Sequence, residues 1–334
     1  MSILRDEIAE QPAVLERLLD REAGAIAALA ASLTGVRFAL IAARGSSDNV
    51  ARYAQHVLGR FARIPVALAT PSLYTLYGAP PRLDRALVIG ISQSGASPDV
   101  TSVVADAAAQ GQATLAITND PASPMGRAAE HVIALGTGEE RSVAATKTYT
   151  ASLAAVAALA AAIGGDTALT DELRSAPAAV ARQLAQPVDR AVERAATWQR
   201  CAVVGRGANY ATAFEAALKV KELTGIAAEP YSPPDLMHGP VAVVGPEHGV
   251  LAFAPPGPTS GDVLHAVREA ERRGAPSIVA SGDPDSLIPL VPLPDWLSPL
   301  GAAVAAQRLA AGLAERRGIP VDTPFGLSKI TRTT

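Results

Sequence analysis

Short apolar strands alternate with helical segments along the chain, and this alternation constrains the fold more than any other feature. Buried strands are expected at residues 37–43, 85–91 and 113–119, with a shorter one at 131–135, and helical patterns such as residues 99–111 lie between them. Strands that are apolar at every position are typical of parallel sheets covered on both faces. The alternation therefore predicts an α/β fold built from right-handed βαβ units.

The second half of the chain repeats the first. Residues 85–100 align with residues 248–263 at a constant offset of 163 (248 − 85), and residues 43–45 align with residues 205–207 at an offset of 162 (205 − 43). Each match is short, and two parallel-sheet segments of similar composition can look alike by chance. Taken together, the matches favour two copies of one α/β module.

A chain of 334 residues also suggests two domains, at roughly 150 residues per domain. The connector between the two copies contains helical runs, which predicts helical packing rather than a flexible linker. We expect an N-terminal helical segment (1–34), a first module (35–165), a helical connector (166–198), a second module (199–315) and a C-terminal active-site tail (316–334).

The composition argues against several classes of protein. A net charge of −3 offers no basic excess for nucleic acid, and 4% aromatic residues provide few platforms for stacking bases. The single cysteine, Cys201, excludes an internal disulfide and a multi-cysteine zinc site. Residues 1–22 are charged throughout, unlike a secretory signal, and the apolar stretch 151–163 is too short to span a bilayer. We expect a cytoplasmic protein with a buried helix at 151–163 and with no nucleic-acid or membrane partner.

The segment ISQSGASPD follows an expected strand and opens an expected helix. Ser97 suits the helix N-cap and Pro98 suits the first helical position. A turn of this kind directs backbone N–H groups toward an anion, and the side chains of Ser92, Gln93 and Ser94 add neutral donors. The segment lacks the GxxxxGK[ST] pattern, so it indicates a phosphate on a small molecule rather than a nucleoside triphosphate. An ordinary capped turn is the alternative.

A companion turn, RGSSDN at residues 44–49, follows the preceding strand. Ligands of open parallel sheets bind outside the carboxyl ends of the strands, so the two hydroxyl-rich turns are expected to face one pocket. In the second copy, residues 255–260 read PPGPTS, and prolines there remove backbone donors. The sequence therefore predicts one phosphate site per chain.

Ionisable side chains gather in the second copy and the tail. Lys219 and Glu222 are three residues apart on an expected helix and share a face, although a solvated ion pair would look the same. His238 lies in a proline-flanked loop, where it could carry protons or be a plain surface residue. Residues 142–147 precede a helix, which they could cap, or they could border the pocket. Lys329 stands near the C-terminus.

Seven motifs in order along nearly the whole chain resemble the double-SIS (sugar isomerase) family: RGSSDN, ISQSGASPDV, ITND, SVAATKTYT, ALKVKEL, HGP and VDTPFGLSK. The sequence is most similar to the isomerase half of glucosamine-6-phosphate synthase and to stand-alone glucosamine-6-phosphate deaminases of the SIS type. The resemblance implies two tandem SIS modules, each a parallel sheet flanked by helices in three αβα layers of the flavodoxin-like kind.

The resemblance also implies roles for individual residues. Glu222 matches the carboxylate that moves a proton between C1 and C2, and Lys219 a lysine beside it. His238 matches a ring-opening histidine that reaches in from the neighbouring subunit of a homodimer. Lys329 matches a lysine near the carbonyl carbon. The phosphate-binding matches are Ser47, Ser92, Gln93, Ser94 and Ser97, and the substrate-lining matches are Gly45, Ser46, Val143, Ala145 and Ser328.

The implied substrate is a hexose phosphate or amino-sugar phosphate, with no cofactor and no metal. The synthase carries a glutaminase domain with a catalytic cysteine, whereas the only cysteine in this sequence is Cys201. We therefore expect conversion of glucosamine 6-phosphate to fructose 6-phosphate and ammonia. Pro233, Pro234 and Met237 depart from the family pattern near the sugar. These departures leave open an isomerase or deglycase acting on another sugar phosphate, or a sugar-phosphate-binding protein without catalysis.

Overall fold

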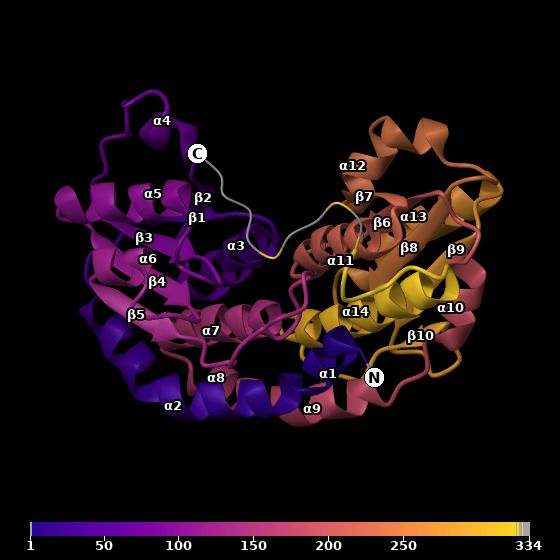
Figure 1. The fold of residues 1–334 in the computed structure, drawn as a ribbon, viewed down its shortest axis with the longest axis horizontal. Coiled ribbons are helices and arrows are strands. Elements are labelled where there is room, and N and C mark those ends of the chain that lie inside the picture. The colour runs from indigo at the N-terminus through magenta and orange to yellow at the C-terminus, as the bar shows by residue number, and fades with distance from the viewer. Residues whose placement is uncertain (1, 325, 327–328, 330–334) are drawn as a thin grey trace. The chain divides into compact units, whose positions relative to one another are not determined.

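The computed structural model describes residues 2–324, 326 and 329 (Figure 1). Ser328, one of the substrate-lining candidates, lies outside the described residues.

The chain divides into two compact units, and the division does not follow the order of the sequence. One short segment that precedes the first module, and one that interrupts it between residues 140 and 147, belong with the second module. The first unit, called the N-unit, holds residues 13–140 and 147–175, and the second, called the C-unit, holds residues 2–12, 141–146 and 176–329.

The N-unit is built on a five-stranded sheet in the order β2-β1-β3-β4-β5, with every neighbouring pair parallel. The four expected strands are confirmed to within one residue, but β2 is not expected from the sequence because it has three residues, none of them fully buried. The strands are β1 (Phe38–Ala43), β2 (Val66–Leu68), β3 (Ala86–Ile91), β4 (Ala113–Thr118) and β5 (His131–Ala134).

Helices cover both faces of this sheet. Valines of α5 and Met125 of α6 pack with Leu40, Val88 and Ala116 on one face, and α3 packs with α7 and contacts β1 to β3. The helical elements are α2 (Gln11–Ser32), α3 (Ser46–Val57), a π-helical turn (Leu58–Ala62), α4 (Ser72–Thr75), α5 (Pro98–Ala109), α6 (Pro124–Ala128), α7 (Lys147–Gly164) and α8 (Thr167–Arg174).

Helix α7 is a core helix of the N-unit. By length and composition it could cross a membrane, with a mean hydropathy of 1.3, but 78% of its residues are buried inside the protein. The buried helix expected at residues 151–163 is therefore confirmed.

The C-unit repeats the architecture with a sheet in the order β10-β9-β8-β6-β7, again parallel throughout. Helix α13 packs on one face of this sheet, and α11 packs against α14. The strands are β6 (Arg200–Val204), β7 (Ala227–Tyr231), β8 (Gly249–Ala254), β9 (Ser277–Ser281) and β10 (Ile288–Pro289). The helices are α1 (Ile3–Ala9), α9 (Ala176–Leu184), α10 (Asp189–Ala195), α11 (Asn209–Thr224), α12 (Pro233–Met237), a 3-10 turn (Pro240–Val243), α13 (Ser260–Arg272) and α14 (Ser298–Arg316).

The two sheets have the same topology. Within each module the second strand lies on one side of the first and the third strand on the other, which is the flavodoxin-like order. In the N-unit β1 pairs with β3 from Phe38 opposite Ala86, and in the C-unit β6 pairs with β8 from Cys201 opposite Gly249. The repeat and the fold class expected from the sequence are confirmed. Each sheet reverses its strand order between the first and third strands, which is where open α/β sheets bind ligands.

Candidate functional site

The turn between β3 and α5 carries four of the predicted phosphate-binding residues. Gly95 N donates to Ser92 Oγ at 3.2 Å, and Ala96 N donates to Ser94 Oγ at 3.3 Å. Ser97 occupies the N-cap of α5 as expected, but its hydroxyl makes no capping hydrogen bond with the helix. The Ser97 hydroxyl is therefore not used to cap α5.

Contacts with β4 and α6 hold this turn in place. Asn119 N donates to Gln93 O, and Met125 N donates to Gly95 O, both at 3.0 Å. Gly95 has a φ of +59°, and a Cβ atom there would lie 2.0 Å from Ser123 Oγ. Only glycine fits this position, so the shape of the turn is fixed by its surroundings before any ligand binds.

The companion turn at residues 44–49 follows β1. Strand β1 pairs directly with β3, so the two turns follow neighbouring strands of the sheet. Gly45 precedes α3 with a φ of +55°, and Ser46 and Ser47 form the start of that helix. Arg44 Nε lies 2.7 Å from Asp99 Oδ2, so an ion pair joins the two turns. The Arg44 side chain is half-exposed and places a positive charge beside the two turns. Arg44 was not identified as a site residue from the sequence.

The second copy keeps this ion pair but loses several of the donors. Arg206 Nε lies 2.9 Å from Asp262 Oδ2, at the positions that align with Arg44 and Asp99. Between β8 and α13, however, prolines replace residues of the turn, and a Cβ atom on Gly257 would lie 3.0 Å from Asp295 Oδ1. The ion pair therefore belongs to the shared fold, whereas the positions of Ser92, Gln93 and Ser94 carry no side-chain donor in the second copy.

Helix α11 carries a cluster of three charged side chains, Glu215, Lys219 and Glu222. Lys219 Nζ lies 3.6 Å from Glu215 Oε1 and donates a hydrogen bond to Glu222. The side chains of Lys219 and Glu215 are 1% and 0% exposed, and that of Glu222 is 23% exposed. The alternative of a solvated ion pair is therefore wrong for Lys219. Glu222 is the member of the cluster that solvent or a ligand can reach.

Glu215 was not predicted from the sequence. Its only signal is the spacing of four residues between Glu215 and Lys219, which is common on exposed helices. The burial of the Glu215–Lys219 pair distinguishes it from such exposed pairs, because a buried lysine needs carboxylate partners to remain charged.

His238 lies in the turn directly after the short helix α12, where it is the C-cap residue. Pro233 and Pro234 fill the first positions of that helix, which suit proline. His238 Nδ1 lies 2.7 Å from Pro234 O, an atom that can only accept a hydrogen bond. Nδ1 must therefore carry a proton, which leaves Nε2 of the exposed ring for proton exchange.

Residues 141–146 belong to the C-unit together with Glu222, His238 and Lys329. Val143 and Ala145 are half-buried there. Thr146, in this segment, directly precedes α7. The carboxylate of Glu140 accepts from Thr148 N at 3.0 Å and from Thr148 Oγ1 at 2.7 Å, which satisfies an amide in the first turn of that helix. The predicted phosphate-binding residues all lie in the N-unit.

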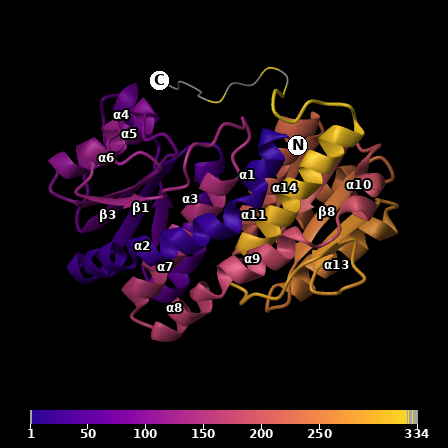
Figure 2. The ribbon, with the colours of Figure 1, turned by 60° about the horizontal axis from the view of Figure 1, so that its bottom comes forward.

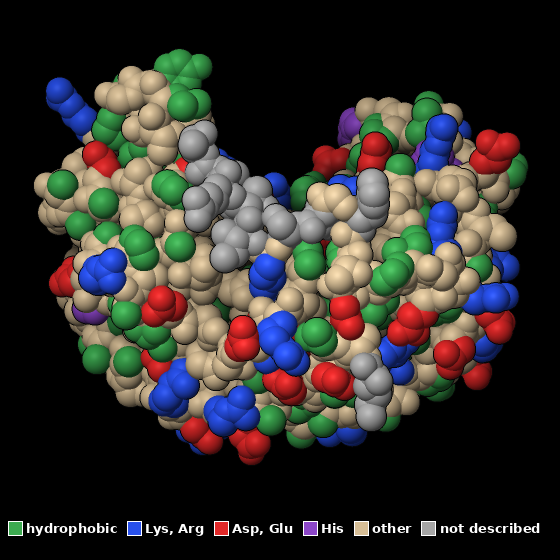
Figure 3. Space-filling view, in the orientation of Figure 1, with side chains coloured by type: hydrophobic (Ala, Val, Ile, Leu, Met, Phe, Trp, Pro, Cys, Tyr) green, Lys and Arg blue, Asp and Glu red, His purple; other side chains and the backbone are tan. Residues whose placement is uncertain are grey.

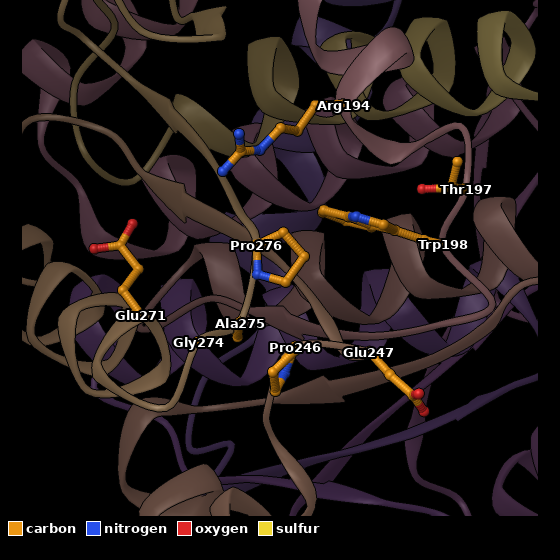
Figure 4. A pocket seen from close by; sticks show the side chains of 9 residues that line it. All are labelled: Arg194, Thr197, Trp198, Pro246, Glu247, Glu271, Gly274, Ala275 and Pro276. Carbon is orange, nitrogen blue, oxygen red and sulfur yellow. The ribbon is translucent and has the colours of Figure 1, made fainter.

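A surface pocket of about 490 Å³ lies elsewhere in the C-unit (Figure 4). Its lining includes Trp198, Pro246 and Pro276, which precede β6, β8 and β9. The pocket therefore opens at the amino edge of the second sheet, whereas ligands of such folds bind at the carboxyl edge. On the face of the molecule in Figure 3, acidic and basic side chains are interspersed among the described residues.

Comparison with known proteins assigns the family. The family model described as SIS domain matches residues 32–162 and 196–289. The glutamine–fructose-6-phosphate aminotransferase [isomerizing] of Gloeobacter violaceus is 34% identical over 97% of this chain and 57% of its own length. The chain thus spans a little over half the length of the curated relatives it matches.

Two solved structures cover nearly the whole chain. A proposed phosphosugar isomerase of Silicibacter pomeroyi DSS-3 superposes with a TM-score of 0.88 at 32% identity, covering 96% of this chain and 99% of that one. The C-terminal domain of glucosamine-fructose-6-phosphate aminotransferase from Francisella tularensis gives a TM-score of 0.87 at 25% identity, covering 97% and 98%. The chain, with its two flavodoxin-like modules, therefore belongs to the SIS domain family.

Proposed function

We propose that this chain is a phosphosugar aldose–ketose isomerase that converts glucosamine 6-phosphate to fructose 6-phosphate and ammonia. The observation that carries the proposal is the Lys219–Glu222 pair, in which a buried cation hydrogen-bonds a carboxylate that remains partly exposed. An ionised carboxylate held in a fixed position is what proton abstraction next to a carbonyl group requires.

The N-unit supplies the phosphate anchor in this proposal. The hydroxyls of Ser94 and Ser97, together with the N-terminal amides of α5, are suited to a phosphate dianion. The fixed geometry of the turn around Gly95 means that these donors need no rearrangement on binding. Arg44 adds a positive charge beside the same turn.

Ring opening is assigned to His238. The cyclic sugar must open before C2 becomes acidic, and this step moves a proton between the O1 hydroxyl and the ring oxygen. With Nδ1 bonded to Pro234 O, His238 Nε2 can accept and return that proton. By resemblance the histidine serves the neighbouring subunit of a homodimer, and that assignment is part of the proposal.

Isomerisation is assigned to Glu222. Its carboxylate removes the C2 proton of the open-chain amino sugar, and the C2–H electron pair forms a C1–C2 double bond. The C1 carbonyl pair moves to O1, which takes up a proton from solvent, and the product is an enolamine. Return of the proton to C1 gives an imine at C2, which water hydrolyses to fructose 6-phosphate and ammonia. The Lys219 cation keeps the base oriented, and Lys329 by resemblance stabilises charge at the carbonyl.

An assay of ammonia and ketose across a panel of sugar phosphates tests the proposal. Equal amounts of ammonia and fructose 6-phosphate from glucosamine 6-phosphate support it. Isomerisation of a neutral sugar phosphate without ammonia would favour the second candidate, an isomerase of another sugar phosphate. Pro233, Pro234 and Met237, the departures from the family pattern, are the reason to keep that candidate.

A further inference from the structure

Glu7 of α1 holds a segment that lies far away in the sequence. Its side chain is buried, and its carboxylate accepts from Arg141 N at 2.5 Å, from Ser142 N at 3.2 Å and from the Ser142 hydroxyl. All these residues belong to the C-unit. A buried carboxylate is stable only where donors surround it, so this contact specifies where residues 141 and 142 lie.

The other end of residues 141–146 is held from the same part of the chain. Gln11 Nε2 donates to Gln307 Oε1 at 2.9 Å, and Gln307 Nε2 donates to Thr146 O at 3.4 Å. Both glutamines are fully buried. The segment that carries Val143 and Ala145 is therefore fixed at both ends through buried side chains of α1, the start of α2, and α14.

Helix α1 also holds the start of the C-terminal tail. The carboxylate of Asp322 accepts from Ile3 N at 3.0 Å and from Leu4 N at 2.9 Å, which satisfies the first amides of α1. Arg5 pairs with Glu315 near the end of α14 at 2.6 Å, and α1 lies beside α14 in both ribbon views (Figure 2). One short helix thus contacts both the sugar-lining segment and the tail that leads to Lys329.

We infer that Glu7 is a positioning residue, through which α1 sets the placement of Val143 and Ala145 against the sugar. The inference rests on the proposed function for its kinetic consequence. Residues 141–146 have no helix or strand of their own, so their placement depends on these bonds. A glutamine at position 7 would turn an amide N–H₂ toward donors of Arg141 or Ser142, and at least one bond would be lost. A displaced lining segment impairs binding of the sugar but leaves the phosphate-binding turn of the N-unit unchanged.

The test compares wild type with Glu7→Gln and Ser142→Ala, the second of which removes only the hydroxyl donor. Asp6→Asn, which removes an exposed carboxylate from the same helix, is the matched control. Three quantities are measured: amide hydrogen exchange in peptides covering residues 141–146 and 92–97, KM for glucosamine 6-phosphate, and Ki for inorganic phosphate as a competitive inhibitor. The thermal midpoint reports whether each variant remains folded.

We expect exchange at residues 141–146 to become about tenfold faster in Glu7→Gln, with unchanged exchange at residues 92–97. KM should rise about tenfold while Ki for phosphate stays within about twofold, and Ser142→Ala should show a smaller change in the same direction. Unchanged exchange at 141–146, or a parallel rise of KM and Ki, would overturn the inference. If wild type does not turn over the sugar, the proposed function fails, and the exchange measurement still decides whether Glu7 holds the segment.

Discussion

Lys219 and Glu222 are hydrogen-bonded across one turn of α11, and the lysine is buried while the carboxylate remains partly exposed. Glu215 lies on the other side of the same ammonium group, fully buried. Two carboxylates thus compensate one buried cation, and only one of them can reach a substrate. The proposed function uses this arrangement, with Lys219 orienting the carboxylate and Glu222 transferring the proton.

Removing the buried cation should destabilise the protein. Lys219→Met removes the cation that lies 3.6 Å from the buried Glu215 carboxylate, and breaking a buried ion pair costs about 3–5 kcal/mol of unfolding free energy. The double variant Lys219→Met/Glu215→Gln should recover part of that loss, because it also removes the buried negative charge. Urea unfolding of both variants measures the difference. Equal stability of Lys219→Met and wild type would contradict the claim that the buried ion pair is needed for stability.

The donors of the turn between β3 and α5 should set the affinity for phosphate. Ser94→Ala and Ser97→Ala should each weaken binding of glucosamine 6-phosphate by about ten- to a hundredfold, the loss of one hydrogen bond to a charged group. Ser260 aligns with Ser97 in the second copy, so Ser260→Ala is the matched control and should bind normally. Calorimetric titration provides the affinities. Equal losses in Ser97→Ala and Ser260→Ala would contradict a single phosphate site.

The proposed homodimer makes a complementation prediction. Glu222→Gln and His238→Asn should each be inactive alone, because each removes a group that every site needs. If His238 serves the neighbouring subunit, random mixed dimers regain one intact site in half of the molecules, or about a quarter of wild-type activity. Activity is measured after the two variants are unfolded and refolded together. A mixture as inactive as its components would contradict a shared site.

The Arg5–Glu315 pair should make a small contribution to stability that depends on pH. The hydrogen bond from Arg5 lowers the pKa of Glu315 below its ordinary value of 4.5. A lowered pKa in the folded state means that the contribution is present above pH 4.5 and is lost as the pH falls through the lower folded value. Both side chains are about two-fifths exposed, so the contribution is at most about 1 kcal/mol.

The measurement compares wild type with Glu315→Gln by urea unfolding from pH 7 down to pH 3. Wild type should be the more stable protein at pH 7, and the difference should shrink as the pH falls. If the difference in unfolding free energy between wild type and Glu315→Gln grew on acidification, it would contradict a stabilising Arg5–Glu315 pair.

The fold could be predicted from the sequence because strands such as β1, β3 and β8 are continuous runs of almost entirely buried residues, and because the pattern recurs with a fixed offset. The edge strand β2 could not, because three partly exposed residues leave no periodic signal. The turn after β3 was recognisable because its donors are neighbours in the chain.

Contacts that depend on the tertiary structure could not be predicted from local sequence patterns. Glu215 has only its spacing of four residues from Lys219 as a local signal, and its burial is a property of the folded protein. Glu7 and Ser142 are separated by 135 residues, and no local pattern links them. Arg44 and Asp99 meet only because β1 and β3 are neighbours in the sheet.

The proposal that Glu222 is the base of a deaminating isomerase is tested most directly by measuring ammonia release from glucosamine 6-phosphate by wild type and Glu222→Gln, with binding of the same sugar followed by calorimetry. Glu16→Gln, an exposed carboxylate of α2, is the control and should behave as wild type. The account predicts that Glu222→Gln loses about a thousandfold or more in turnover while its affinity stays within about threefold. Turnover within about tenfold of wild type, or loss of binding together with turnover, would contradict it.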